Sequence, residues 1–107
     1  MQIQVNTDNF IQGDERLEEV VRMEVNDHIG HLEDHLTRVE VHIKDQNGDK
    51  QGPENIHCTM EARPKGLQPI SAHDDAANIQ SAVTGAARKL KTRLLKEFGK
   101  MESRKKQ

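Results

Sequence analysis

Four cationic side chains near the end of the chain have the spacing of neighbours on one side of an α-helix. They are Lys89, Arg93, Lys96 and Lys100, separated by four, three and four residues. At about 100° of rotation per residue they fall within one narrow sector of a helix, and the rise of 1.5 Å per residue makes the row roughly 16 Å long. That length spans two or three successive phosphates of a nucleic acid strand. We call these four residues the basic rail and predict that it binds a phosphate backbone.

The rail belongs to a strongly basic final third of the chain. Residues 1–62 hold 5 Lys/Arg and 14 Asp/Glu, whereas residues 63–107 hold 11 Lys/Arg and 4 Asp/Glu, a contrast hidden by the overall charge of -2. Such an asymmetry is typical of a protein that offers one basic face to a polyanion. The further candidate RNA-binding cations, on the same helix and beside Pro64, are Arg88, Lys91, Arg63 and Lys65, and Arg104, Lys105 and Lys106 extend the charge.

The basic residues also have a purely structural interpretation. Lys and Arg near the C-terminal end of a helix complement the helix dipole and keep that face solvated. The concentration of nine Lys/Arg against two Asp/Glu from Ala86 onward favours binding. Because the chain has no Trp or Tyr on which bases could stack, recognition of the backbone and shape of the nucleic acid is favoured over base reading.

Other residues could bind a metal or act in catalysis, but their spacing is less specific evidence for a site. His28, His31 and His35 lie along the first predicted helix, and the spacing of the last two suits zinc, but pH sensitivity is the more economical interpretation. Cys58 alternates with apolar residues and is predicted to be buried. Asp74 and Asp75 are interpreted as helix caps. We therefore expect no enzyme, no catalytic residue, no metal site and no cofactor.

The periodicity of the apolar residues predicts the order of the elements. The segments Met1–Asn6, Arg38–Lys44, Ile56–Arg63 and Leu67–Ala72 alternate as strands do, and Pro69 suggests that the last of them is an edge strand. One amphipathic helix is expected from an N-cap at Asp14 to about His35, and a second from near Asp75, with Asp74, Asp75 or Asn78 as its cap.

These elements predict an α+β fold of the order β-α-β-β-β-α. Each strand and helix has a single apolar face, so the economical arrangement is a two-layer sandwich with both helices on one face of a four-stranded mixed sheet. The polar face of the sheet offers hydrogen-bond donors to RNA, but Glu40 and Glu61 lie on it and repel phosphates. A solvated surface is an equally good interpretation of that face.

Length and composition fit a single domain. The 107 residues, the single cysteine and the lack of an apolar stretch of membrane-spanning length indicate a cytoplasmic protein without a disulfide. Residues 1–100 are expected to form the domain, residues 101–107 a frayed basic tail, and the free protein a monomer with no membrane partner and no small-molecule substrate.

The pattern of elements, together with the text N-I-Q-S-A-V-T-G-A-A-R-K-L-K-T-R-L-L-K-E-F-G-K from Asn78 to Lys100, resembles the ribosome hibernation promoting factor and ribosome-associated inhibitor family, also described as sigma-54 modulation proteins. The last helix keeps Ala82, Leu90 and Leu94 together with three rail lysines. It departs from the family pattern at Gln80, Thr84, Arg93 and Phe98, which suggests a divergent, short member.

The resemblance implies a noncatalytic factor for ribosome hibernation under stress. Its partner would be the small ribosomal subunit and its rRNA, bound near the decoding centre so that the mRNA and tRNA sites are blocked. Lys89, Lys96 and Lys100 would then contact rRNA phosphates. Two alternatives remain open: a module that binds another structured RNA, and a histidine-dependent metalloprotein.

Overall fold

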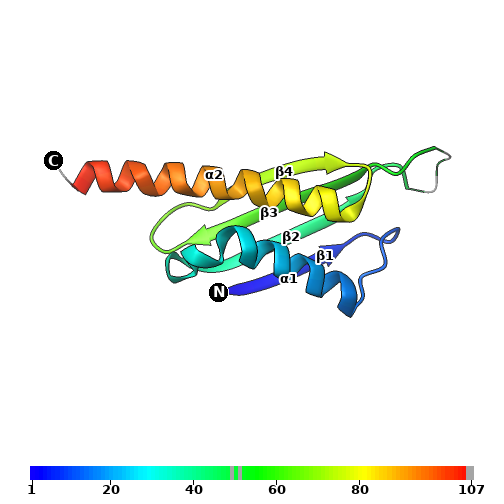
Figure 1. Cartoon of the computed structure of the whole chain (residues 1–107), viewed down its shortest axis with the longest axis horizontal. Helices are drawn as coiled ribbons and strands as arrows, with labels where there is room; N and C mark the ends of the chain where they lie inside the picture. The colour runs from blue at the N-terminus through cyan, green and yellow to red at the C-terminus, as the bar shows by residue number, and fades with distance from the viewer. Residues whose placement is uncertain (49, 51, 106–107) are drawn as a thin grey trace.

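The computed structural model describes residues 1–48, 50 and 52–105, with side chains as far as residue 101. Figure 1 shows a sheet with both helices on one face and α2 projecting beyond it. The elements are β1 (Gln2–Thr7), α1 (Glu15–Ile29), the 3₁₀ helix η1 (Gly30–His35), β2 (Leu36–Asp45), β3 (Ile56–Pro64), β4 (Ile70–Ala76) and α2 (Ile79–Lys105). The predicted α+β class and the order of helices and strands are confirmed.

The four strands form one mixed sheet in the order β1-β2-β3-β4. β1 runs parallel to β2, with Val5 opposite Val41, whereas β2, β3 and β4 are antiparallel to their neighbours. β4 is therefore an edge strand, as the sequence predicted. Pro69 itself precedes the strand, where its missing N–H disturbs no ladder.

The core lies between the sheet and the two helices. Val39, Val41 and Met60 of the sheet are fully buried, as are Leu90 and Leu94 of α2. Alternation along each strand directs these side chains to the helices and leaves the polar residues on the opposite, open face. A short series of alanines, Ala82, Ala86 and Ala87, is also buried along α2 and allows the helix to approach the sheet closely.

The first helix begins as predicted but ends earlier. Asp14 caps it by accepting a hydrogen bond from the backbone N–H of Leu17 (2.9 Å). The prediction that the helix continues to about His35 is wrong, because α1 ends at Ile29, whose φ and ψ of -127° and 5° leave the helical region. A 3₁₀ turn follows, and it brings both Leu32 and Leu36, the first residue of β2, into the core.

The boundary between β4 and α2 also differs from the prediction. Asp74 and Asp75 are not caps but strand residues of β4, paired with Cys58 and His57 of β3. The cap is Asn78, whose side-chain oxygen accepts a hydrogen bond from the backbone N–H of Ser81 (2.8 Å). Pairing with the long β3 extends the strand four residues past Ala72, where local sequence alone favoured the start of a helix.

At its other end α2 continues to Lys105. The predicted division between a domain and a frayed tail at residue 100 stays a prediction, and Lys106 and Gln107 lie outside the described residues. Among the helices of the described part of the chain, none combines the length and the apolar character needed to cross a bilayer.

Candidate nucleic-acid interface

The basic rail lies on the flank of α2 that faces the edge strand β4. Two adjoining hollows, of about 480 and 780 Å³, share Thr92 and Arg93 and together form an open groove between helix and strand. The strand side consists of residues 70–73, preceded by the β3–β4 loop. We call this feature the basic groove. The cationic residues that line it are Arg88, Lys89, Arg93, Lys96 and Lys100.

Lys89 is anchored at one end of the groove by an acidic residue of β4. Its Nζ lies 2.7 Å from Oδ1 of Asp74, and this hydrogen bond is the main reason that the pKa of the Asp74 carboxyl is lowered. Gly85 makes room for the contact, because a Cβ at Gly85 would overlap the Asp74 carboxylate. Part of the positive charge of Lys89 is therefore neutralised within the protein.

Arg93 is anchored to the strand rather than to an acid. Its Nη1 donates a hydrogen bond to the backbone carbonyl of Ser71 (2.6 Å). A neutral acceptor leaves the full charge of the guanidinium in place and fixes its position at the centre of the groove. The bond also occupies one backbone acceptor of the edge strand, which limits pairing with another strand.

The remaining groove cations make fewer hydrogen bonds and ion pairs within the protein. Lys100 lies 3.4 Å from Glu97 in a pair in which both side chains are about half exposed, a geometry that contributes little stability. For Lys96 and Arg88, both exposed, the described residues provide no side-chain hydrogen bond or ion pair. These side chains keep the reach and the charge that phosphate binding requires.

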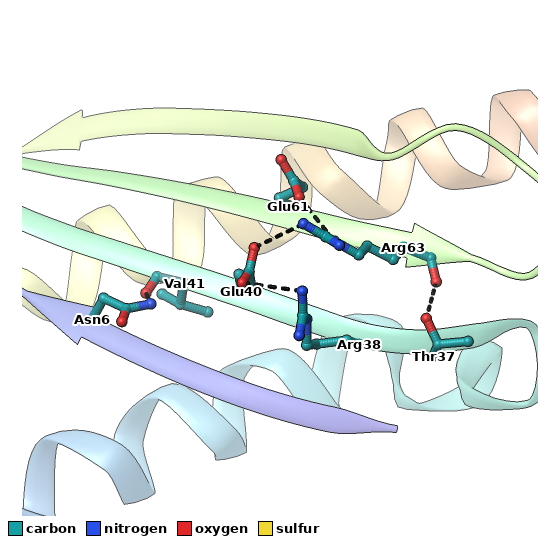
Figure 2. Close-up of polar contacts among 7 residues, drawn as sticks. All are labelled: Asn6, Thr37, Arg38, Glu40, Val41, Glu61 and Arg63. Atoms are coloured by element: carbon teal, nitrogen blue, oxygen red, sulfur yellow. Dashed lines mark hydrogen bonds and ion pairs between the residues drawn. The ribbon is translucent and has the colours of Figure 1, made fainter.

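The structure separates three other predicted cations from the groove. Lys91 lies about 160° around α2 from Lys89, on the opposite flank. Lys65 is exposed in the turn after β3, where its backbone N–H donates to the carbonyl of His35 (2.9 Å). Arg63 points to the open face of the sheet (Figure 2). The sequence alone therefore grouped more cations than one surface holds.

Arg63 belongs to an ion-pair network with alternating charges. Its Nε lies 3.2 Å from Glu61 and its Nη2 lies 3.5 Å from Glu40, which also pairs with Arg38 at 3.4 Å (Figure 2). Arg63 is matched by one carboxylate on its own strand and one on the neighbouring strand, and Arg38 by the glutamate two residues further along β2. The open face thus lacks the excess of positive charge that the groove has.

The structure also locates the cysteine and the histidines that the sequence offered as other candidate site residues. Cys58 is fully buried, as predicted, and burial raises its pKa to about 12, with a smaller contribution from the charge of Asp74. Such a thiol is a poor nucleophile. His28 belongs to α1, while His31 and His35 belong to η1, so their expected helical spacing is lost, and within the described part of the chain they form no metal-ligand cluster.

Among the described residues that line the groove, five cations face one carboxylate, that of Glu97, while Asp74 is already paired with Lys89. The groove therefore has the excess of positive charge that a linear polyanion would require. The groove follows α2 for more than three turns, and its cations are mostly exposed at its mouth. Phosphate groups along one strand of nucleic acid carry the complementary charge.

Comparisons with known proteins agree with this architecture. A family model described as sigma 54 modulation protein / S30EA ribosomal protein matches residues 3–102. A ribosomal subunit interface protein from Coxiella burnetii superposes with a TM-score of 0.77 at 16% identity, covering 92% of this chain and 99% of that one. The N-terminal domain of Thermus thermophilus Protein Y gives a TM-score of 0.67 at 12% identity, covering 87% and 94%. No curated protein matches the sequence.

Proposed function

The chain belongs to the sigma 54 modulation protein / S30EA ribosomal protein family, which is ribosome-associated, and from this premise we propose that it inhibits translation by binding the small ribosomal subunit. The basic groove holds rRNA phosphates near the decoding centre. Bound there, the protein excludes mRNA and tRNA and keeps the ribosome idle during stress.

The observation that carries this proposal is the concentration of five cations in the groove between α2 and β4. Lys89 and Arg93 are held in place by β4, so part of the site is preorganised, while the long side chains of Arg88, Lys96 and Lys100 adapt to the phosphate positions. Binding to a backbone needs no chemistry on the substrate, which fits a factor that occupies a site rather than turning over a substrate.

The test reverses the charge of the groove cations whose side chains contribute little to the stability of the fold. In the groove variant, Arg88→Glu, Lys96→Glu and Lys100→Glu are combined, while Lys89 and Arg93 stay because their contacts with β4 support the fold. Three charge-assisted contacts of about 1.5–3 kcal/mol each are lost, so the affinity for 30S subunits falls by about 2000-fold or more. Cosedimentation with purified subunits, together with thermal unfolding, measures both binding and folding.

A matched control separates the position of the charge from its amount. Arg16→Glu, Arg22→Glu and Lys44→Glu produce the same change in net charge, and all three residues are exposed outside the groove. This control variant is expected to bind 30S subunits within a few-fold of wild type. Equal losses in the two variants would show that net charge, not the groove, governs binding, and unchanged binding of the groove variant would refute the proposal.

A further inference from the structure

Two histidines and an aspartate come together on the open face of the sheet, where one of them, His73 of the edge strand, also borders the basic groove. His57 belongs to β3, and His73 and Asp75 belong to β4. Asp75 is the direct cross-strand partner of His57, and His73 lies two residues earlier on the same strand. Alternation therefore directs all three side chains to one face.

The distances between these side chains suit the binding of one metal ion by all three. One potential metal-binding atom from each residue lies within 4.8 Å of the other two. His57 Nδ1 is 2.7 Å from Asp75 Oδ1, and the rings of His57 and His73 have their centroids 5.4 Å apart. Tetrahedral zinc, with bonds of about 2.0–2.1 Å, needs ligand atoms roughly 3.3 Å apart, so adjustments of an ångström or so are enough. Asp75, with a half-exposed side chain, and the exposed His73 can rotate at little cost.

A second observation concerns the orientation of His57. Its Nε2 lies 3.1 Å from the hydroxyl of Thr59, the next residue on the same face of β3. This bond turns Nδ1 toward Asp75. When Nδ1 binds a metal, Nε2 carries the proton and its N–H donates a hydrogen bond to the hydroxyl oxygen of Thr59, which is the supporting interaction that metal-bound histidines usually make.

We propose that His57, His73 and Asp75 bind a zinc ion on the open face, with Thr59 as the residue that positions His57. Imidazole nitrogens and a carboxylate oxygen suit Zn²⁺, and three protein ligands leave a fourth position for water. Lys44, opposite His57 on β2, adds a positive charge nearby, so the site binds more weakly than a closed four-ligand structural site. This site is separate from the proposed ribosome-binding role.

The experiment titrates metal-free protein with ZnCl₂ in a calorimeter. Wild type is expected to bind one zinc ion with a Kd of about 100 µM or lower. His57→Ala, His73→Ala and Asp75→Asn each weaken binding at least tenfold, because each removes a ligand. Thr59→Val keeps all three ligands and still weakens binding by about 10-fold, as loss of a supporting hydrogen bond does.

A histidine on the same face provides the control. His42 is exposed on β2, and Thr59 separates it from His73 in the register, so His42→Ala is expected to bind zinc as wild type does. Circular dichroism checks that each variant is folded. The proposal is overturned if wild type binds no zinc in this range, or if folded His57→Ala and Asp75→Asn variants bind it as tightly as wild type. Cosedimentation of the His57→Ala and Asp75→Asn variants with 30S subunits, without zinc, is expected to be unchanged, so this result is independent of the groove test.

Discussion

The basic groove and the open face of the sheet lie on opposite sides of the same edge strand, yet they differ in their balance of positive and negative side chains. In the groove, five cations from α2 meet a strand that offers Asp74 and backbone carbonyls. On the open face, Arg38 and Arg63 are each within ion-pair distance of a glutamate. The first surface can attract a polyanion, whereas the second is close to neutral.

The contrast arises from alternation along β3 and β4. Asp74 faces α2, and its neighbours His73 and Asp75 face the open side, so one strand contributes to both surfaces, and His73 at the edge borders the groove as well. It follows that the number of cations in a sequence segment does not define an interface. What matters is which of them share a face and how many carboxylates share it with them.

The reactivity of Cys58 is the strongest test of the alternation of β3 between the core and the open face. Cys58 is adjacent to the partly exposed His57 in sequence but points into the core. With a pKa of about 12 instead of 9.0, its thiolate fraction at pH 8 is about 1000-fold lower than in the unfolded chain. Its reaction with a disulfide reagent is expected to be slower in the native protein by about 100-fold or more, because burial suppresses the thiolate and blocks access of the reagent. Similar rates with and without denaturant would contradict the assigned alternation of β3.

Removing the carboxylates of the open face should weaken the contrast directly. Glu40→Gln combined with Glu61→Gln leaves Arg38 and Arg63 without their ion-pair partners, so the open face becomes basic. We expect the affinity for an unrelated double-stranded RNA to rise by roughly 10-fold, about one added phosphate contact. Filter binding at low salt measures this. No increase would mean that these glutamates do not suppress binding to other RNA.

Gly85 tests how the groove is anchored. A methyl group there meets Asp74, which costs about 1–3 kcal/mol as overpacking and exceeds the gain in helix propensity of about 1 kcal/mol. Gly85→Ala is therefore expected to destabilise the protein slightly in urea unfolding. Gly99→Ala is the control, since no atom lies near that position, and it should stabilise by up to about 1 kcal/mol. Stabilisation by both variants would mean that Asp74 is not held against α2.

Much of the fold could be predicted from the sequence because its signals are local. Strict alternation defines β1, β2 and β3, and the apolar stripe of α2 predicts the burial of Val83, Leu90 and Leu94. The spacing of the rail residues was enough to place them on one flank. These features depend on the periods of strand and helix, which the chain displays without reference to its partners.

The remaining features depend on contacts between distant segments. Asp74 and Asp75 have the composition of a helix start, and only pairing with β3 makes them strand residues. Because of that error the cluster of His57, His73 and Asp75 was missed, and the anchoring of Lys89 by Asp74 with it. The position of Arg63 on the open face was accessible from alternation in β3, which places it with Glu61.

The measurement that tests the central claim most directly is the salt dependence of 30S binding by wild type and by the two triple variants. The groove variant, with Arg88→Glu, Lys96→Glu and Lys100→Glu, loses about three phosphate contacts, so its plot of log affinity against log salt should be shallower by roughly 2–3. The control variant, with Arg16→Glu, Arg22→Glu and Lys44→Glu, should keep the wild-type slope. Parallel lines for wild type and the groove variant would contradict the assignment of rRNA binding to the basic groove.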